Sequence, residues 1–235
     1  MEPLRIQYRY LFEDGTDAVF DLEFDPGTLE LRGGADGPPP DWTRLGFEQC
    51  SNCPLSSAEH ERCPLAVKLV GTVRRFSELI SWSRMRLQVT TRERTVAQET
   101  TTQIGLSSLM GLIMATSGCP HTLPFRPMAR HHLPLASTDE TAYRAVGTYL
   151  IAQYLVHRSG GRPDLALEGL RRIYEEVEKV NVGIAGRLRA ATERDSTLNA
   201  VVLLDVFAKT LPVALDDSLQ ELREIFAGYL PPAEG

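Results

Sequence analysis

The sequence predicts an α+β protein, with strands in the first part of the chain and helices in the second. Apolar and polar residues alternate near the N-terminus, which is typical of half-buried strands. Further along, apolar residues recur every three or four positions, as in amphipathic helices, and helix-capping residues precede them. We expect an α+β region at residues 1–135 and a helical bundle region at residues 136–235.

The first 32 residues predict a small antiparallel β-meander. Its three strands are expected at residues 4–12, 18–24 and 28–32, and Asp14-Gly15 is a hairpin turn between the first two. A sheet this small needs a partner layer to bury its apolar face. We therefore expect further elements of the same region to cover it.

The middle of the chain predicts those elements. Pro64 is favourable at the first position of a helix, because it lacks the N–H that would have no partner there. Strands are expected at residues 84–89 and 95–101, and a helix at residues 103–116. That helix contains Gly105 and Gly111, which indicate close packing in the interior, and Gly118 fits its C-terminal cap.

The last hundred residues predict a four-helix unit. Ser137 and Glu140 form a capping box for a helix that reaches about residue 157. Further helices are expected from Asp164, from 195 or 196 to 212, and from 216 to 229. The second of the four has a narrow apolar seam, from which we expect a homodimer or another protein partner. The seam consists of Ala166, Leu170, Ile173, Val177, Val180 and Ile184.

Composition narrows the class of protein. With 43% hydrophobic and 24% charged residues, the chain is an ordinary globular one, and 235 residues bury a core without disulfides. The net charge of −6 argues against general nucleic-acid binding. The N-terminus does not look like a signal peptide, and no window is apolar enough to span a membrane. We expect a cytoplasmic protein whose thiols stay reduced.

The four cysteines are the main candidate site. Cys50 and Cys53 form a Cys-x2-Cys turn, Cys63 precedes the helix that Pro64 begins, and Cys119 follows another helix. Two chelating sulfurs and two more thiolates would complete the tetrahedral set that zinc prefers. We expect one four-cysteine metal site holding structural zinc, with a 4Fe–4S cluster as the alternative. Buried unpaired thiols and disulfides also remain open.

A second candidate site is the loop that follows Cys119, at residues 121–134. It is rich in histidine and arginine, side chains that bind anions or transfer protons. A solvated basic loop explains the same residues. The candidates are His121, Arg126, Arg130, His131 and His132.

These sites lead to three functional hypotheses. The first is a non-enzymatic zinc-binding protein that acts as an interaction or regulatory module. The second is an iron–sulfur protein with a redox or sensing role. The third is an enzyme that uses the histidine and arginine loop beside the metal.

Overall fold

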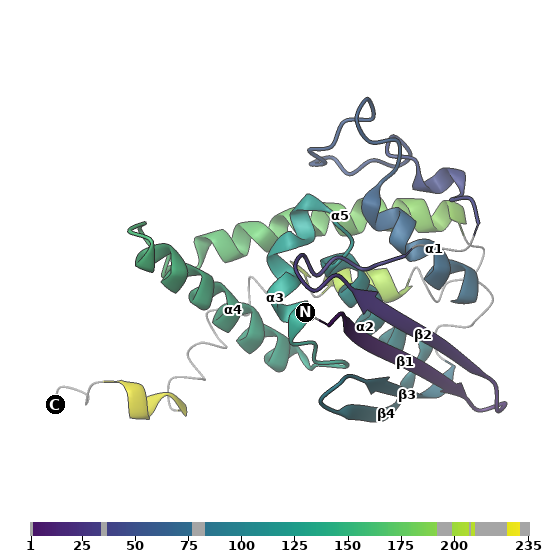
Figure 1. The fold of residues 1–235 in the computed structure, drawn as a ribbon, viewed down its shortest axis with the longest axis horizontal. Helices are drawn as coiled ribbons and strands as arrows, with labels where there is room; N and C mark the ends of the chain where they lie inside the picture. The colour runs from purple at the N-terminus through teal and green to yellow at the C-terminus, as the bar shows by residue number, and fades with distance from the viewer. Residues whose placement is uncertain are drawn as a thin grey trace.

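A computed structural model of the chain describes residues 2–33, 37–76, 83–191, 199–206, 208–209 and 225–230. It confirms the α+β class, with a four-stranded antiparallel sheet near the N-terminus and helices after it (Figure 1). None of the helices in these residues is long and apolar enough to cross a membrane.

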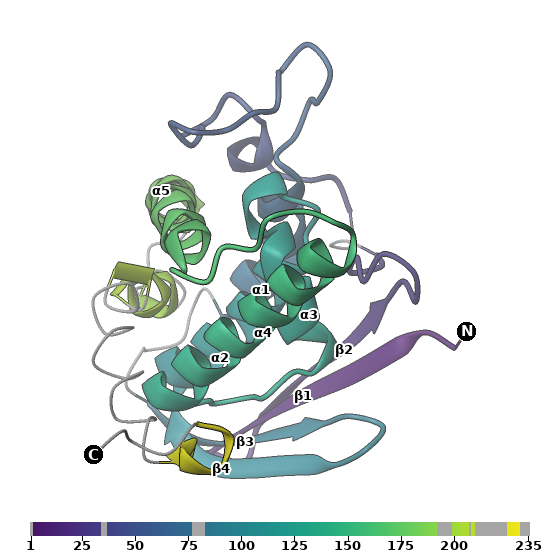
Figure 2. The same cartoon turned by 90° about the vertical axis from the view of Figure 1, so that its left-hand side faces the viewer.

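The sheet has the strand order β2-β1-β3-β4. Its strands are β1 (Leu4–Phe12), β2 (Asp17–Phe24), β3 (Arg84–Thr90) and β4 (Thr95–Thr101). Tyr8 pairs with Phe20 on one side and with Val89 on the other. Alternate side chains of β1 and β3 are buried, as the period of two predicts. The helices lie over this one face of the sheet (Figure 2).

The predicted strand at residues 28–32 is wrong. Only an isolated bridge joins Leu31 to Phe24, and the third strand of the sheet is β3 instead. The Asp25 carboxylate accepts the N–H groups of Gly27 and Thr28, which turns the chain at this point. Leu31 then donates its N–H to Thr116 at the end of a helix, so this segment connects the sheet to the helical layer.

Two helices form the layer next to the sheet, α1 (Pro64–Phe76) and α2 (Thr102–Ala115). The main core lies between them and the sheet. Gly105 of α2 is a point of close approach, because a Cβ there would overlap the Met85 side chain and lie 3.2 Å from the Tyr10 ring. The helix that the sequence predicts from Pro64 is described as far as Phe76, and residues 77–82 lie outside the described part of the chain.

Short helical turns lead from α2 to the C-terminal helices. These turns are η2 (Pro120–Phe125) and α3 (Arg126–Arg130), and a further turn, η1 (Asp41–Thr43), precedes the cysteine segment. The long helices are α4 (Thr138–Arg158) and α5 (Glu168–Ala191), and they share a second, smaller core. The predicted capping box is confirmed, with Glu140 N–H donating to Ser137 Oγ and Ser137 N–H to the Glu140 carboxylate.

α5 begins at Glu168, four residues later than predicted. The Asp164 carboxylate accepts the N–H groups of Ala166 and Gly169, and Leu167 has a φ of 60°, so the chain turns before the helix starts. Most of the predicted seam of α5 is buried inside the chain, against α1, η1 and η2. Of the third predicted helix, residues 199–206 and 208–209 are described and are helical, and most of the fourth lies outside the described residues. Ile225 and Tyr229, within the predicted fourth helix, are exposed.

Candidate functional site

The cysteine segment, residues 41–63, is fastened to α5. The buried Arg187 guanidinium donates to the carbonyl oxygens of Trp42 and Arg44, both at 2.7 Å, and of Leu45 at 2.9 Å. A Cβ at Gly183 would lie 2.6 Å from Cys50 Sγ, so glycine permits the segment to approach the helix. The sequence signal for this contact was the pair of glycines, 183 and 186, within a long helix.

The predicted metal centre is wrong. Cys50, Cys53, Cys63 and Cys119 line a small apolar pocket of about 20 Å³ together with Val180, Ile184 and other residues. Within the described part of the chain, however, no three side chains of the histidine, cysteine, aspartate or glutamate type are placed to hold a metal ion. Neither zinc nor an iron–sulfur cluster is supported. The hypotheses of a zinc-binding protein and of an iron–sulfur protein are therefore not supported either.

The cysteines are packed as small apolar side chains. All four are free, so the disulfide alternative is not what the structure shows. Cys63 belongs to the main core and the other three pack against it. Burial, and then the neighbouring Cys63 and Cys119, raises the pKa of Cys50 to about 12, which favours the neutral thiol over the thiolate that a metal needs.

The five side chains of the histidine and arginine loop go to different places. His121 hydrogen-bonds through Nε2 to the Asn52 carbonyl at 2.8 Å and lines the cysteine pocket. Arg126 pairs with Glu30 at 2.7 Å. Arg130 and His131 are exposed, and His132 turns inward. Their role in anion binding stays a prediction.

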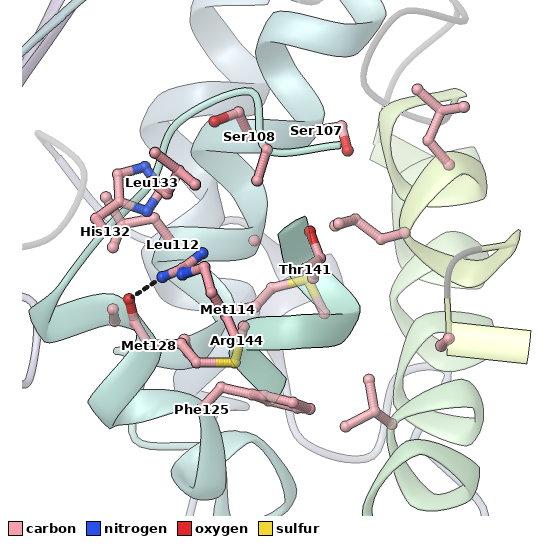
Figure 3. Close-up of a pocket in the computed structure, with 18 of the residues that line it drawn as sticks. Ser107, Ser108, Leu112, Met114, Phe125, Met128, His132, Leu133, Thr141 and Arg144 are labelled. Carbon is pink, nitrogen blue, oxygen red and sulfur yellow. Dashed lines mark hydrogen bonds between the residues drawn. The ribbon is translucent and has the colours of Figure 1, made fainter. Parts of the chain in front are cut away.

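A second, much larger cavity, of about 550 Å³, is lined by His132 among other residues. Among the described residues, it is lined by α2, η2, α3, the loop that follows α3, the start of α4, α5 and residues 203, 204, 206 and 208. Figure 3 shows Met114, Phe125 and Met128 around the same space, each from a different element. Protein interiors contain few voids larger than a water molecule, whereas ligand pockets measure about 300–1,000 Å³. The size and the apolar wall are those of a ligand site.

One wall of the cavity is held by a chain of hydrogen bonds from the sheet. Leu135 N–H donates to Ser108 Oγ at 3.2 Å, Ser108 Oγ lies 3.0 Å from the Tyr8 hydroxyl, and that hydroxyl bonds to His132 Nε2. Burial, and then the charge of Arg144, lowers the pKa of His132 to about 3, so the ring is neutral and accepts at Nε2. The network fixes the loop that the sequence marked as a second candidate site.

Asn181 of α5 is the polar group that the cavity leaves unpaired. Its side chain lines the cavity, and the residue is only 1% exposed. Neither its Oδ1 nor its Nδ2 has a hydrogen-bond partner among the described residues. Leaving a buried amide in this state costs about 1–3 kcal/mol. A signal for this residue was present in the sequence: an asparagine stands inside the apolar seam, four residues after Val177 and three before Ile184.

Arg144 of α4 brings a positive charge to the same cavity. Its Nη2 donates to the carbonyl oxygens of Met128 at 2.8 Å and His131 at 2.9 Å, and the first of these bonds is drawn in Figure 3. Burial lowers the pKa of Arg144, though the neighbouring Tyr174 and Glu140 act in the opposite direction. Within the described residues, no carboxylate forms an ion pair with this guanidinium.

Comparison with known proteins places the whole of this architecture in one family. A family model described as a domain of unknown function (DUF6901) matches residues 6–227. The chain belongs to this family. The DUF6901 match includes the sheet, the cysteine segment and the elements that enclose the cavity. No curated protein and no solved structure matches the chain.

Proposed function

We propose that this protein binds a small amphiphilic molecule in the cavity of about 550 Å³. The observation that carries the proposal is the side chain of Asn181, which is buried at the cavity wall with both polar atoms unpaired. Buried polar groups are nearly always hydrogen-bonded. If the Asn181 side chain rotates toward the cavity, a ligand that offers a donor and an acceptor to its amide removes the penalty, and the apolar body of the ligand fills the space between the methionine and leucine side chains.

Arg144 indicates the charge of the ligand. Among the described residues, the half-buried Arg144 guanidinium bonds to neutral carbonyl oxygens and pairs with no carboxylate, so its positive charge is compensated only in part, by the nearby Glu140. Both of these bonds use Nη2, so Nη1 is left for a ligand oxygen. A carboxylate is the simplest group that matches a guanidinium in charge and geometry. The preferred ligand is therefore an organic acid with an apolar body.

The positions of the two polar groups indicate an elongated ligand. Tyr174, whose pKa responds to the charge of Arg144, lies seven residues before Asn181 on α5. At about 1.5 Å per residue, this spacing corresponds to roughly 10 Å along the helix. An acid group at Arg144 and a hydroxyl, carbonyl or amide at Asn181 would thus sit at opposite ends of the apolar space.

The experiment that tests the proposal blocks the cavity from one wall. Gly111 of α2 lines the cavity, and a Cβ there would meet only Leu204 Cδ2, at 3.5 Å. Gly111→Leu should fill the space without a clash. Gly71→Leu is the matched control, because Gly71 is an exposed helical glycine with open space around it among the described residues. The probe is anilinonaphthalene sulfonate, an apolar dye with one negative charge, titrated by fluorescence.

The expected result is that wild type and Gly71→Leu bind the dye alike and Gly111→Leu loses the signal. The affinities for decanoate and decanol are then compared, because the two molecules have the same apolar chain and only decanoate is charged. Arg144→Met should weaken decanoate by roughly 10- to 100-fold, the value of a charged hydrogen bond, and leave decanol nearly unchanged. If Gly111→Leu binds dye and decanoate as wild type does, the cavity is not a binding site.

A cytoplasmic location is part of the proposal. Its support is that all four cysteines are free thiols, which is the state that a reducing compartment maintains. Measuring thiols in protein taken from gently lysed cells, with a thiol-reactive reagent added at lysis, tests it. Oxidised cysteines in that sample would contradict this location.

A further inference from the structure

We propose that the protein forms a two-fold symmetric dimer through the exposed face of α4, in which the α4 helices of the two copies pack antiparallel. This inference does not depend on a ligand in the cavity. It rests on the exposure, the charge pattern and the glycine of a single helix.

The second half of α4 carries large apolar side chains that nothing in the described part of the chain covers. Ile151 is 65% exposed, Tyr154 is 56% exposed and Leu155 is 59% exposed. The buried residues of the helix, Ala142, Ala145 and Val146, lie in its first half, and its far end extends away from the sheet (Figure 1). Contiguous apolar surface of this kind marks an interaction site.

Ile151 and Tyr154 belong to a stripe along the helix, called here the α4 stripe. Its members follow one another at steps of three or four residues, except for the adjacent Leu150 and Ile151, as on a helix that packs along another helix. The stripe points away from Ala142, Ala145 and Val146, which face the body of the protein. Its members are Tyr143, Gly147, Leu150, Ile151, Tyr154 and Arg158.

The charges of α4 favour a second copy in antiparallel orientation. Residues 145–157 contain no aspartate, glutamate, lysine or arginine, whereas the first turn is acidic and the last turn basic. An antiparallel pair places each acidic end beside the basic end of the other copy. A two-fold axis between residues 150 and 151 brings Tyr143 opposite the partner's Arg158, which then lies one helical turn from Asp139. The same chain thus supplies both halves of a complementary interface.

The shape of the α4 stripe fits the same register. Gly147 lies opposite the partner's Tyr154, and a Cβ at Gly147 would meet nothing within 4 Å among the described residues. The glycine leaves a hole into which the partner's Tyr154 can pack, and Leu150 then meets the partner's Ile151. A glycine inside a helix costs about 1 kcal/mol relative to alanine, and close approach of a second helix accounts for it here.

Sedimentation velocity of the full chain, over a series from low to several hundred micromolar, tests the dimer. Wild type should associate, and Ile151→Glu should be monomeric throughout, because each dimer would bury two carboxylates. Val182→Glu is the matched control: Val182 is 59% exposed, but lies on α5 outside the α4 stripe. This variant should associate as wild type does. Circular dichroism checks that each variant is folded.

A charge exchange tests the register. Arg158→Glu should weaken association, and adding Asp139→Arg to it should restore association, since the pair occurs twice in a symmetric dimer. Gly147→Leu should also weaken the dimer although leucine favours the helix. A wild type that stays monomeric, or a dimer that Ile151→Glu leaves intact, overturns the proposal. Failure of the double exchange to restore association overturns the antiparallel register.

Discussion

Replacing Asn181 with leucine should stabilise the free protein while weakening its proposed binding function. Asn181 is 1% exposed and its amide has no partner among the described residues. Removing that unpaired group should recover about 1–3 kcal/mol of unfolding free energy, and leucine adds a few tenths as the better helix former. Leucine has as many side-chain heavy atoms as asparagine, and the cavity beside it gives room to the two methyl groups that replace the amide oxygen and nitrogen.

The assay is urea unfolding followed by circular dichroism, together with calorimetry. For a chain of 235 residues, 1 kcal/mol shifts Tm by about 2–4 °C, so Asn181→Leu should melt about 3–10 °C higher than wild type. Val182→Leu, at the exposed position next to it, measures the helix-propensity part alone. In parallel, the dye titration should show weaker binding by Asn181→Leu than by wild type.

The opposite sign refutes the reasoning. If Asn181→Leu lowers the unfolding free energy by more than about 1 kcal/mol, the amide makes hydrogen bonds in the free protein, and those bonds are what the variant has lost. If stability rises but dye affinity is unchanged, the unpaired amide is real but does not contact the ligand. Only higher stability combined with weaker binding supports the role proposed for Asn181.

Three further outcomes test the packing around the cavity and the cysteine segment. Gly111→Ala should raise the unfolding free energy by about 0.5–1 kcal/mol, because a Cβ there makes an ordinary contact with Leu204 at 3.5 Å. Gly105→Ala should lower it by at least about 1 kcal/mol, because a Cβ there overlaps the buried Met85 side chain; urea unfolding measures both. Arg187→Met should destabilise by about 2–4 kcal/mol in the same assay, since three carbonyl oxygens lose their donor, whereas the exposed Arg189→Met should be neutral. Between pH 6.5 and 5, wild type should lose about 1–2 kcal/mol more stability than His132→Gln does. The folded pKa of His132 is about 3, below its unfolded value, so only the unfolded chain gains a proton in that window; equal slopes for the two proteins would contradict the depressed pKa.

The local elements could be predicted because each depends on residues close together in the chain. The period of two located β1 and β3, and the capping box located the start of α4 to the residue. The segment at 28–32 had strand-like composition too, but Asp25 turned it toward the helices, so no strand formed. Propensity alone does not decide whether a neighbouring strand is available to pair with.

The cysteines show where spacing is insufficient. A Cys-x2-Cys turn and two cysteines at helix ends made a shared ion a reasonable expectation, and the four side chains do line one pocket. Packing against Val180 and Ile184 nevertheless leaves no group of ligands placed to hold a metal. The direction of a side chain within a packed core is set by its neighbours, and a spacing rule contains no information about those neighbours.

The sequence by itself determined the α+β class, most strands and helices, the cap of α4 and the apolar seam of α5, because these follow from periodicity and from hydrogen bonds within a few residues. Only the tertiary structure decided that Asn181 within that seam would lie at the wall of a cavity. It also decided that Arg144 would line the same cavity, and that the exposed apolar stripe would be on α4. Cavities and exposed faces are what remains when helices far apart in the chain settle against one another, so their location depends on the sum of all the contacts.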